Sequence, residues 1–163
     1  MSERPRYFQG QVLGVQDLEQ EQLYHREKAR RHNREVHGWG IVRGLHVESG
    51  RPRKAEVKIS PGYALDRRGE EIVVNAGVTV DLSGHPAGST VYVALRYDER
   101  PERPVPVPGP RGKEYSRIRE TFAVEVLTRL PRQKPLVIVG DVELGPGGKI
   151  ARIAATHRRE IRR

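Results

Sequence analysis

Cysteine is absent from this 163-residue sequence, and methionine and tryptophan occur only once each. The lack of cysteine excludes disulfide bonds, thiolate-ligated metal sites and a cysteine nucleophile. No run of about 18 apolar residues occurs, so we expect no membrane-spanning helix. Residues 1–11 contain no apolar core of the kind that signal peptides need, so we expect synthesis in the cytoplasm without a signal peptide.

Aromatic residues are also scarce, whereas positive charge is abundant. The formal net charge is +9 and the sequence pI is about 10.2. A basic chain suits a nucleic-acid or acidic-surface partner, but the 21 acidic residues are interspersed with the basic ones. Two basic clusters stand out, at 26–34 and in the tail 157–163. Tyr92 and Tyr97 fall on different faces of one predicted strand, which does not make a stacking platform for bases.

The length suffices for one domain with a hydrophobic core. Arginine outnumbers lysine, proline is frequent and thermolabile side chains are few. This bias is typical of a thermophile, although a GC-rich genome produces much of the same composition.

One long helix is predicted over residues 15–38, where one set of side chains recurs at alternating spacings of three and four. This spacing is the a/d repeat of a helical seam. Gly14 or Asp17 is the expected N-cap, and Gly38 is the expected left-handed residue after the helix. Apart from Val15, the predicted seam consists of Leu18, Gln22, His25, Ala29, His32 and Val36.

This seam is unusually polar for a helix that covers a sheet. Polar a/d positions often specify register or oligomeric state, which makes the seam a candidate homo-oligomer interface. The alternative is that the helix caps the domain's own sheet with its histidines at a wet edge. His25 and His32 lie two turns apart rather than at the i,i+4 spacing of a zinc pair, so they suggest a ligand site only around a symmetry axis.

Residues 1–14 are predicted to form an arm, anchored by the adjacent aromatics Tyr7 and Phe8. A glycine-rich motif follows the helix, and its glycines indicate a bulge or a close approach of two backbone segments. The motif comprises Gly38, Trp39, Gly40, Gly44 and Leu45.

Residues 39–156 alternate apolar and polar side chains in short segments, which predicts a β-domain. Hairpins are expected at 63–74 and 135–154, and 115–130 favours a strand over a helix. Five prolines in 99–113 predict an exposed loop that is neither strand nor helix. The basic tail 157–163 is expected to fray or form a short helix. The predicted fold is α+β, with one N-terminal helix before a mainly antiparallel β-sandwich or small barrel.

No catalytic motif is evident. The sequence lacks a nucleophile elbow, and the segment 145–149 lacks the spacing of a phosphate-binding loop. Asp66, Glu70 and Glu71 fall at a predicted turn, where solvated acids are ordinary. We therefore predict no enzymatic activity, no cofactor and no metal.

Two stretches carry a family resemblance. The first is YFQGQVLGVQDLEQEQLYHREKARRHNREVHGWGIVRGL and the second is VKISPGYALDRRGEEIVV. They resemble a bacterial and phage family with the pattern YFxGQ…EQxYH…HNRxxHGWGxVxGL, associated with phage tails and contractile injection systems. The closing residues GGKIARIAATHRREIRR are also similar to that family. Gly14 departs from the pattern, which has threonine before the helix.

The resemblance implies a non-enzymatic structural or adaptor subunit near the baseplate or fibre of a tail-like particle. The implied partners are copies of the same chain, in a trimer or higher ring, and other particle subunits. Two alternatives remain open. One is a nucleic-acid-binding module that uses the tail and the helix arginines Arg26, Arg30, Arg31 and Arg34, and the other is a carbohydrate-binding fibre domain.

Overall fold

The computed structural model describes residues 3–51, 54–109 and 112–161. A single α-helix, α1 (Val15–His32), runs into a π-helical turn, η1 (Asn33–His37), and strands account for most of the rest. The α+β prediction is therefore confirmed. The strands are β1 (Gly40–Gly44), β2 (Val47–Ser49), β3 (Glu56–Ile59), β4 (Gly62–Leu65), β5 (Glu71–Val74), β6 (Val78–Asp81), β7 (Thr90–Pro106), β8 (Lys113–Leu127), β9 (Val137–Leu144) and β10 (Ile150–Ala154), with a short 3-10 turn η2 (Pro146–Gly148) before β10.

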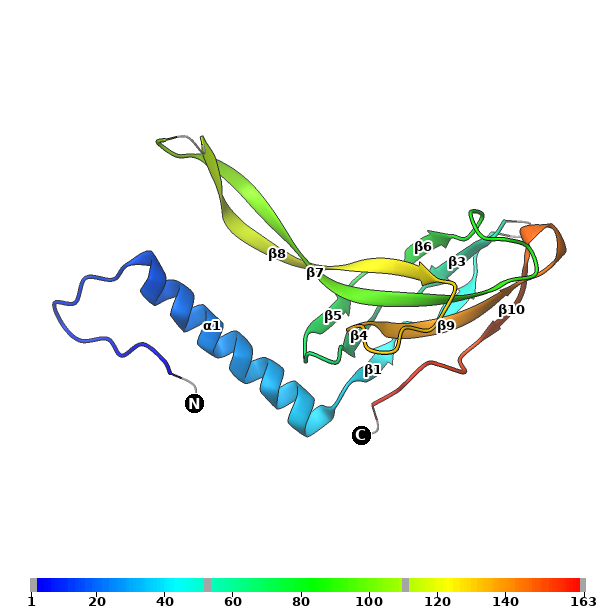
Figure 1. Cartoon of the computed structure of the whole chain (residues 1–163), viewed down its shortest axis with the longest axis horizontal. Coiled ribbons are helices and arrows are strands. Elements are labelled where there is room, and N and C mark those ends of the chain that lie inside the picture. The colour runs from blue at the N-terminus through cyan, green and yellow to red at the C-terminus, as the bar shows by residue number, and fades with distance from the viewer. Residues whose placement is uncertain (1–2, 52–53, 110–111, 162–163) are drawn as a thin grey trace.

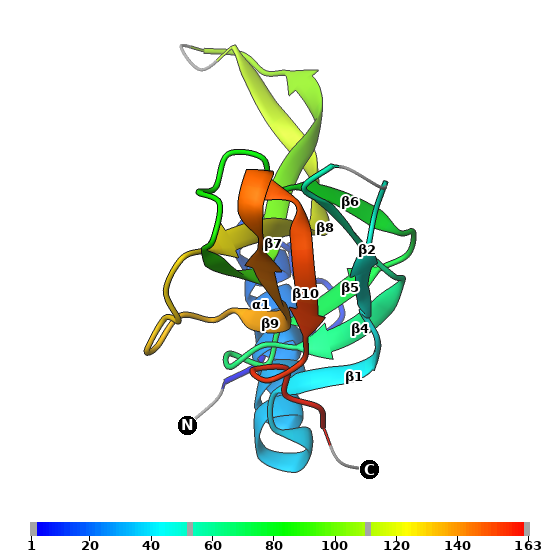
Figure 2. The same cartoon turned by 90° about the vertical axis from the view of Figure 1, so that its right-hand side faces the viewer.

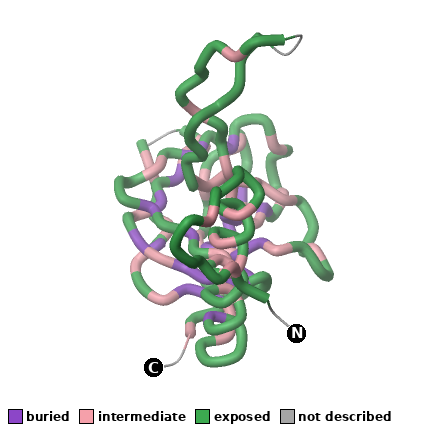
Figure 3. The backbone as a smooth tube through the Cα atoms, turned by 90° about the vertical axis from the view of Figure 1, so that its left-hand side faces the viewer, coloured by how far each residue is buried: buried purple, intermediate pink, exposed green. Residues whose placement is uncertain are grey.

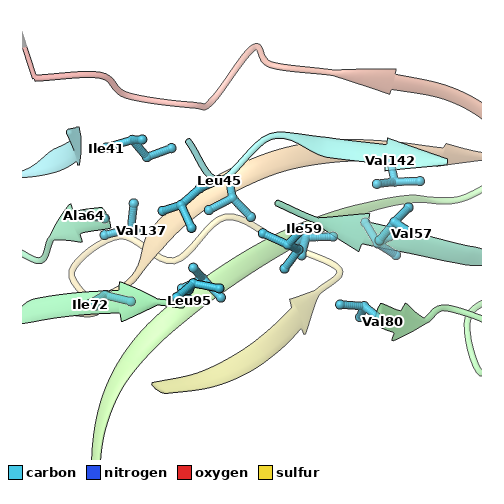
Figure 4. Close-up of a cluster of buried hydrophobic side chains, with 14 of the residues drawn as sticks. Ile41, Leu45, Val57, Ile59, Ala64, Ile72, Val80, Leu95, Val137 and Val142 are labelled. Atoms are coloured by element: carbon cyan, nitrogen blue, oxygen red, sulfur yellow. The ribbon is translucent and has the colours of Figure 1, made fainter. Parts of the chain in front are cut away.

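The strands form three antiparallel sheets, ordered β1-β4-β5, β2-β3-β6 and β10-β9-β7-β8 (Figures 1 and 2). The predicted hairpins are present as β4–β5, which pairs Leu65 with Glu71, and as β9–β10, which pairs Leu144 with Ile150. All three sheets contribute to one core, whose fully buried members include Ile41, Ile59 and Leu95 (Figure 4).

Glycines allow two backbone segments to meet beside this core. A Cβ on Gly44 (φ +63°) would lie 2.1 Å from the carbonyl oxygen of Pro61, and a Cβ on Gly40 would lie 2.7 Å from that of Arg159. The close approach expected at the glycine-rich motif is therefore present, and β1 also carries the expected irregularity, between Ile41 and Arg43.

The prediction of an irregular loop at 99–113 was wrong. β7 continues through Pro106 and pairs with β8 from Tyr92 to Pro106, so the two strands leave the β-domain as a twisted ribbon (Figure 1). Proline fits a strand where its nitrogen points away from the partner strand. Pro101 and Pro104 are an odd number of residues apart, and the ladder is interrupted between them at Arg103, which has a φ of +54°. The pairing keeps the same register on both sides of the interruption, with Pro101 opposite Ile118 and Pro104 opposite Tyr115.

The helical segment begins and ends at the glycines that the sequence indicated. Gly14 is the N-cap, and its N–H donates to the Asp17 carboxylate at 2.9 Å. Gly38 ends the helical segment with a φ of +76°. The α-helical bonding stops earlier than predicted, at His32, because the last turn is π-helical from Asn33 onward.

Residues 157–161 of the tail form a strap across the β-domain, in contrast to the frayed end or short helix that we predicted for 157–163; residues 162–163 lie outside the described part of the chain. Its backbone runs beside β1, where Ile41 N–H donates to the Arg159 carbonyl and Ile161 N–H donates to the Ile41 carbonyl. The Arg158 guanidinium is only 8% exposed and donates to the carbonyls of Gly44 and Leu45 at 2.7 and 2.6 Å. The contacts of Arg158 with these two carbonyls fix the strap beside β1.

Candidate assembly surface

The C-terminal half of α1 is fixed to the β-domain by polar contacts. Arg30 forms an ion pair with Glu70 at 2.5 Å, and Arg26 forms one with Glu99 at the base of the β7–β8 ribbon. Burial of the Arg30 guanidinium opposes its charge, but hydrogen bonds to Glu70 and Glu27 outweigh this and raise the pKa of Arg30. Paired charges of this kind fix an orientation more than they add stability.

The β4–β5 turn meets the helix end at close range. Asn33 is buried and donates from its side-chain amide to the Gly69 carbonyl at 2.9 Å, and Arg34 donates to the Arg68 carbonyl at 2.7 Å. A Cβ on Gly69 would lie 2.2 Å from the Arg30 carbonyl oxygen. The turn and the helix therefore fit only because position 69 has no side chain.

The buried carboxylate of Asp66 stabilises the β4–β5 turn. Its carboxylate accepts hydrogen bonds from the backbone N–H groups of Arg68 and Glu70 at 2.7 and 2.9 Å, and the side chain is almost fully buried. Burial raises the pKa of Asp66, and the two N–H donors partly offset that effect.

The predicted helical seam keeps its side chains exposed, although Leu18, Gln22 and Ala29 lie on the side of α1 that faces the ribbon and the β4–β5 turn. All six seam residues are exposed, and the two largest apolar ones, Leu18 and Val36, keep 51% and 64% of their surface accessible. No residue of α1 is buried within the chain. Self-association through this seam stays a prediction, and the geometry leaves these side chains available for it.

Both histidines of the seam contact neighbouring residues of the helical segment. His25 lies 3.1 Å from the Glu21 carboxylate, and the rings of His32 and His37 meet edge to face at 5.1 Å. Among the described residues, no group of three or more histidine, aspartate and glutamate side chains is placed to hold a metal ion.

A groove of about 640 Å³ separates the N-terminal half of α1 from the β7–β8 ribbon. Val15, Leu18 and Gln22 line its helix wall, and Tyr115 and Ile118 line its ribbon wall. Two predicted seam residues thus contribute to the groove. We did not foresee the ribbon wall, because residues 99–113 read as a loop.

The N-terminal arm runs along a different side of the helix. The Tyr7 hydroxyl donates to Glu21 at 2.9 Å, and this contact lowers the pKa of the Glu21 carboxyl, with a smaller effect of His25. Phe8, the second predicted anchor, is 68% exposed. Only one of the two aromatics is thus engaged within the chain.

Trp39 joins three parts of the molecule. The guanidinium groups of Arg67 and Arg159 lie 3.8 and 4.4 Å from its ring, so the β4–β5 turn and the strap meet at the residue that follows the helix. Cation–π contacts of this kind are attractive at these distances. The glycine-rich motif therefore has a structural role at this junction.

The arginines considered for nucleic-acid binding are largely engaged within the chain. Arg26 and Arg30 pair with glutamates, Arg34 bonds a backbone carbonyl, and Arg158 is buried under the strap. Phosphate contacts need arginines and lysines that are free to reach outward. The charge pattern in the sequence could not reveal the contacts with Glu99, Glu70 and the Arg68 carbonyl, because these partners lie 34 or more residues away in the chain.

Several structurally important residues carried only generic signals in the sequence. Glu99 and Ile118 belong to the segments read as loop and ambiguous strand, and Asp66 was read as a solvated turn residue. An Asp-x-x-Gly sequence between two strands is the one local sign that could have indicated the turn-stabilising role of Asp66.

Within the described part of the chain, no helix combines the length and the apolar character needed to cross a membrane. No protein-family model matches the sequence, and a search of curated proteins finds no match.

Comparison with solved structures finds the same fold in components of a secretion apparatus. The chain is similar to a chain of the baseplate complex from the type VI secretion system, with a TM-score of 0.54 and 15% identity. It is similar to the crystal structure of TssK, with a TM-score of 0.59 and 11% identity. A chain of the TssK-TssF-TssG baseplate subcomplex gives a TM-score of 0.53 and 17% identity.

These matches cover 93%, 95% and 93% of this chain, but only 58%, 41% and 60% of the respective chains. The chain therefore spans about two-fifths to three-fifths of their length. At these identities the likeness concerns the fold.

Proposed function

We propose that this chain is a non-enzymatic structural or adaptor subunit of a phage tail-like or contractile injection particle, associated with its baseplate or fibre. It self-associates through the seam of α1 and through the N-terminal arm, as a trimer or higher ring with closed symmetry. The fold shared with type VI secretion baseplate proteins and the family resemblance of the N-terminal half both support a place in such a particle.

One observation carries the self-association: α1 meets the β-domain mainly through polar contacts of its C-terminal half, and the side chains of its seam stay exposed. An 18-residue helix without a buried residue gains little from its own chain. Most helical stability in proteins comes from packing of an apolar face. A second copy that covers Leu18, Ala29 and Val36 would supply this packing.

The test is solution mass by light scattering, at low and high salt, on the wild-type chain and on the Leu18→Glu/Val36→Glu variant. The expected wild-type mass is an integer multiple of 18.5 kDa that salt leaves unchanged, because apolar packing is not screened. The variant is expected to be a monomer, because each glutamate places a charge in the seam.

The matched control is Val73→Glu/Leu130→Glu, which adds the same charge at two exposed apolar positions of the β-domain. This control should keep the wild-type mass. A wild-type monomer at every concentration would refute the self-association. Binding to nucleic acid that weakens steeply with salt would instead favour the nucleic-acid alternative.

A further inference from the structure

We propose that the groove between α1 and the β7–β8 ribbon is the receptor for the N-terminal arm of a second copy of this chain. This inference rests on the proposed self-association and assigns it a specific contact. The arm segment in question comprises residues 4–13, which include Tyr7, Phe8, Val12 and Leu13.

The groove is held open by contacts at its base. Arg26 of α1 pairs with Glu99 of β7, and the Tyr97 hydroxyl donates to the same carboxylate at 2.9 Å. Deeper in the molecule, Arg30 pairs with Glu70. These contacts set the helix and the ribbon apart on the same side of the β-domain, as Figure 1 shows. A binding site whose walls are already in place avoids part of the ordering cost of association.

Both walls of the groove present apolar side chains that have no cover within the chain. Ile118 is 61% exposed on the ribbon, and Val15 and Leu18 are exposed on the helix. By register, Ile118 and Glu120 lie on the ribbon face that also carries Glu99, whereas Arg100 and Arg119 lie on the opposite face. The face that carries Ile118 is turned toward the helix, and farther out along the ribbon Tyr115 and Arg117 line the groove as well.

The arm has the matching chemistry. It carries two aromatic and two aliphatic side chains, all exposed, with Val12 at 90%. Arg4 and Arg6 are its only charged residues between positions 4 and 13, whereas the groove is lined by Glu19, Glu99 and Glu120 against Arg26 and Arg117. A basic aromatic segment and an acidic apolar groove complement each other in charge and in polarity.

The occupant is a second copy because the chain's own arm lies elsewhere. Tyr7 is bonded to Glu21, and Glu3 lies in a separate pocket with Leu23 and Tyr24, away from the ribbon. Every residue that lines the groove comes from α1 or the ribbon. An extended arm of ten residues spans up to about 35 Å, which is enough to leave its own helix and reach a neighbour packed against the seam.

The absence of native cysteine makes disulfide trapping a direct test. A ¹⁵N-labelled Phe8→Cys chain is mixed in equal amounts with an unlabelled Ile118→Cys chain and oxidised, and mass spectrometry measures the peptide pair linking positions 8 and 118. Arg119→Cys replaces Ile118→Cys as the matched control, since it lies one residue away on the opposite face of the ribbon. Light scattering of the same samples gives their oligomeric state.

We expect the 8–118 link to form far faster than the 8–119 link. A seated arm gives its cysteine an effective concentration on the order of mM, roughly 100-fold above that of free chains at about 10 µM. Equal yields for the two pairs in an oligomeric sample would overturn the groove assignment and leave the self-association standing. A monomeric sample without either link would overturn both.

A doubly substituted Phe8→Cys/Ile118→Cys chain tests whether the arm binds in the groove of its own chain instead of a second copy's groove. If this chain forms the link within single molecules at high dilution, the arm fills its own groove and the second-copy proposal is wrong. Absence of that link at dilution, together with its formation between mixed chains, supports the proposal.

Discussion

Asp66 illustrates how a single buried carboxylate sets the position of the helix. It organises the turn whose carbonyls receive Asn33 and Arg34, so its hydrogen bonds reach α1 through one intermediate. Asp66, Gly69 and Glu70 are ordinary turn residues in sequence. Their importance follows from the surface against which the turn packs, and the sequence does not specify that surface locally.

The ionisation of Asp66 predicts a pH-dependent stability. Burial raises the folded-state pKa above the ordinary value of 3.8. The folded chain therefore binds more protons than the unfolded chain between these two pKa values, and stability falls as pH rises through that window. Asp66→Asn keeps an acceptor oxygen without the charge, so the stability of wild type relative to this variant should improve as the pH is lowered from 7 to 4.

Urea unfolding at pH 7 and pH 4 measures this difference. Asp66→Ala removes both hydrogen bonds and should cost about 1–3 kcal/mol at pH 7. Because it also lacks the carboxyl, its difference from wild type should change with pH in the same direction as that of Asp66→Asn. A difference between wild type and Asp66→Asn that does not change with pH would contradict the predicted shift.

Among the elements, the helix was predictable and the ribbon was not. Heptad spacing and Gly38 located the helical segment formed by α1 and η1 to within one residue, because both signals are local. The ribbon depends on a partner strand and on an interruption at Arg103, so the prolines of 99–113 were misread as a loop. The strap was not predicted, for a similar reason. Arg158 donates to carbonyls that lie more than 100 residues away in the sequence, so no local pattern indicates the contact.

Docking of α1 should depend on the missing side chain at Gly69. Gly69→Ala forces a methyl group against the Arg30 carbonyl and also strains a φ of +84°. Gly88→Ala is matched, since its φ is +75° and no atom lies within 4 Å of the added Cβ. The strain at a left-handed residue costs roughly 1–2 kcal/mol in both variants.

Both variants have the backbone strain, but only Gly69→Ala has the steric clash, so the difference between them measures the effect of the clash. We expect trypsin to cleave α1 faster in Gly69→Ala than in Gly88→Ala, because cleavage follows local opening of weakly held elements. Equal cleavage rates would mean that the turn does not hold the helix.

On the scale of the whole molecule, one compact core carries two appendages, which are the helix with its arm and the outer ribbon. The core cluster draws on all three sheets, whereas α1, the arm and the outer ribbon are largely exposed (Figure 3). The α+β class and the predicted hairpins followed from alternation in the sequence. The groove did not, because it lies between two elements that are about 100 residues apart in the chain.

Shortening the ribbon should leave the core intact. Joining Arg100 directly to Arg119 through Asn-Gly removes the outer ribbon but keeps Glu99 and a register pair suited to a tight turn. The free energy of unfolding should change by about 1 kcal/mol or less, because loop length contributes little. Thermal unfolding measures this, and a large loss of stability would show that the outer ribbon supports the core.

The junction at Trp39 gives this protein a built-in optical reporter. The only indole of the chain is clamped between guanidinium groups from the β4–β5 turn and from the strap, directly after the helix. Its emission spectrum therefore responds when the helix, the turn or the tail is released. The movements of these three parts can be followed in the unlabelled chain, including during incorporation into a larger particle.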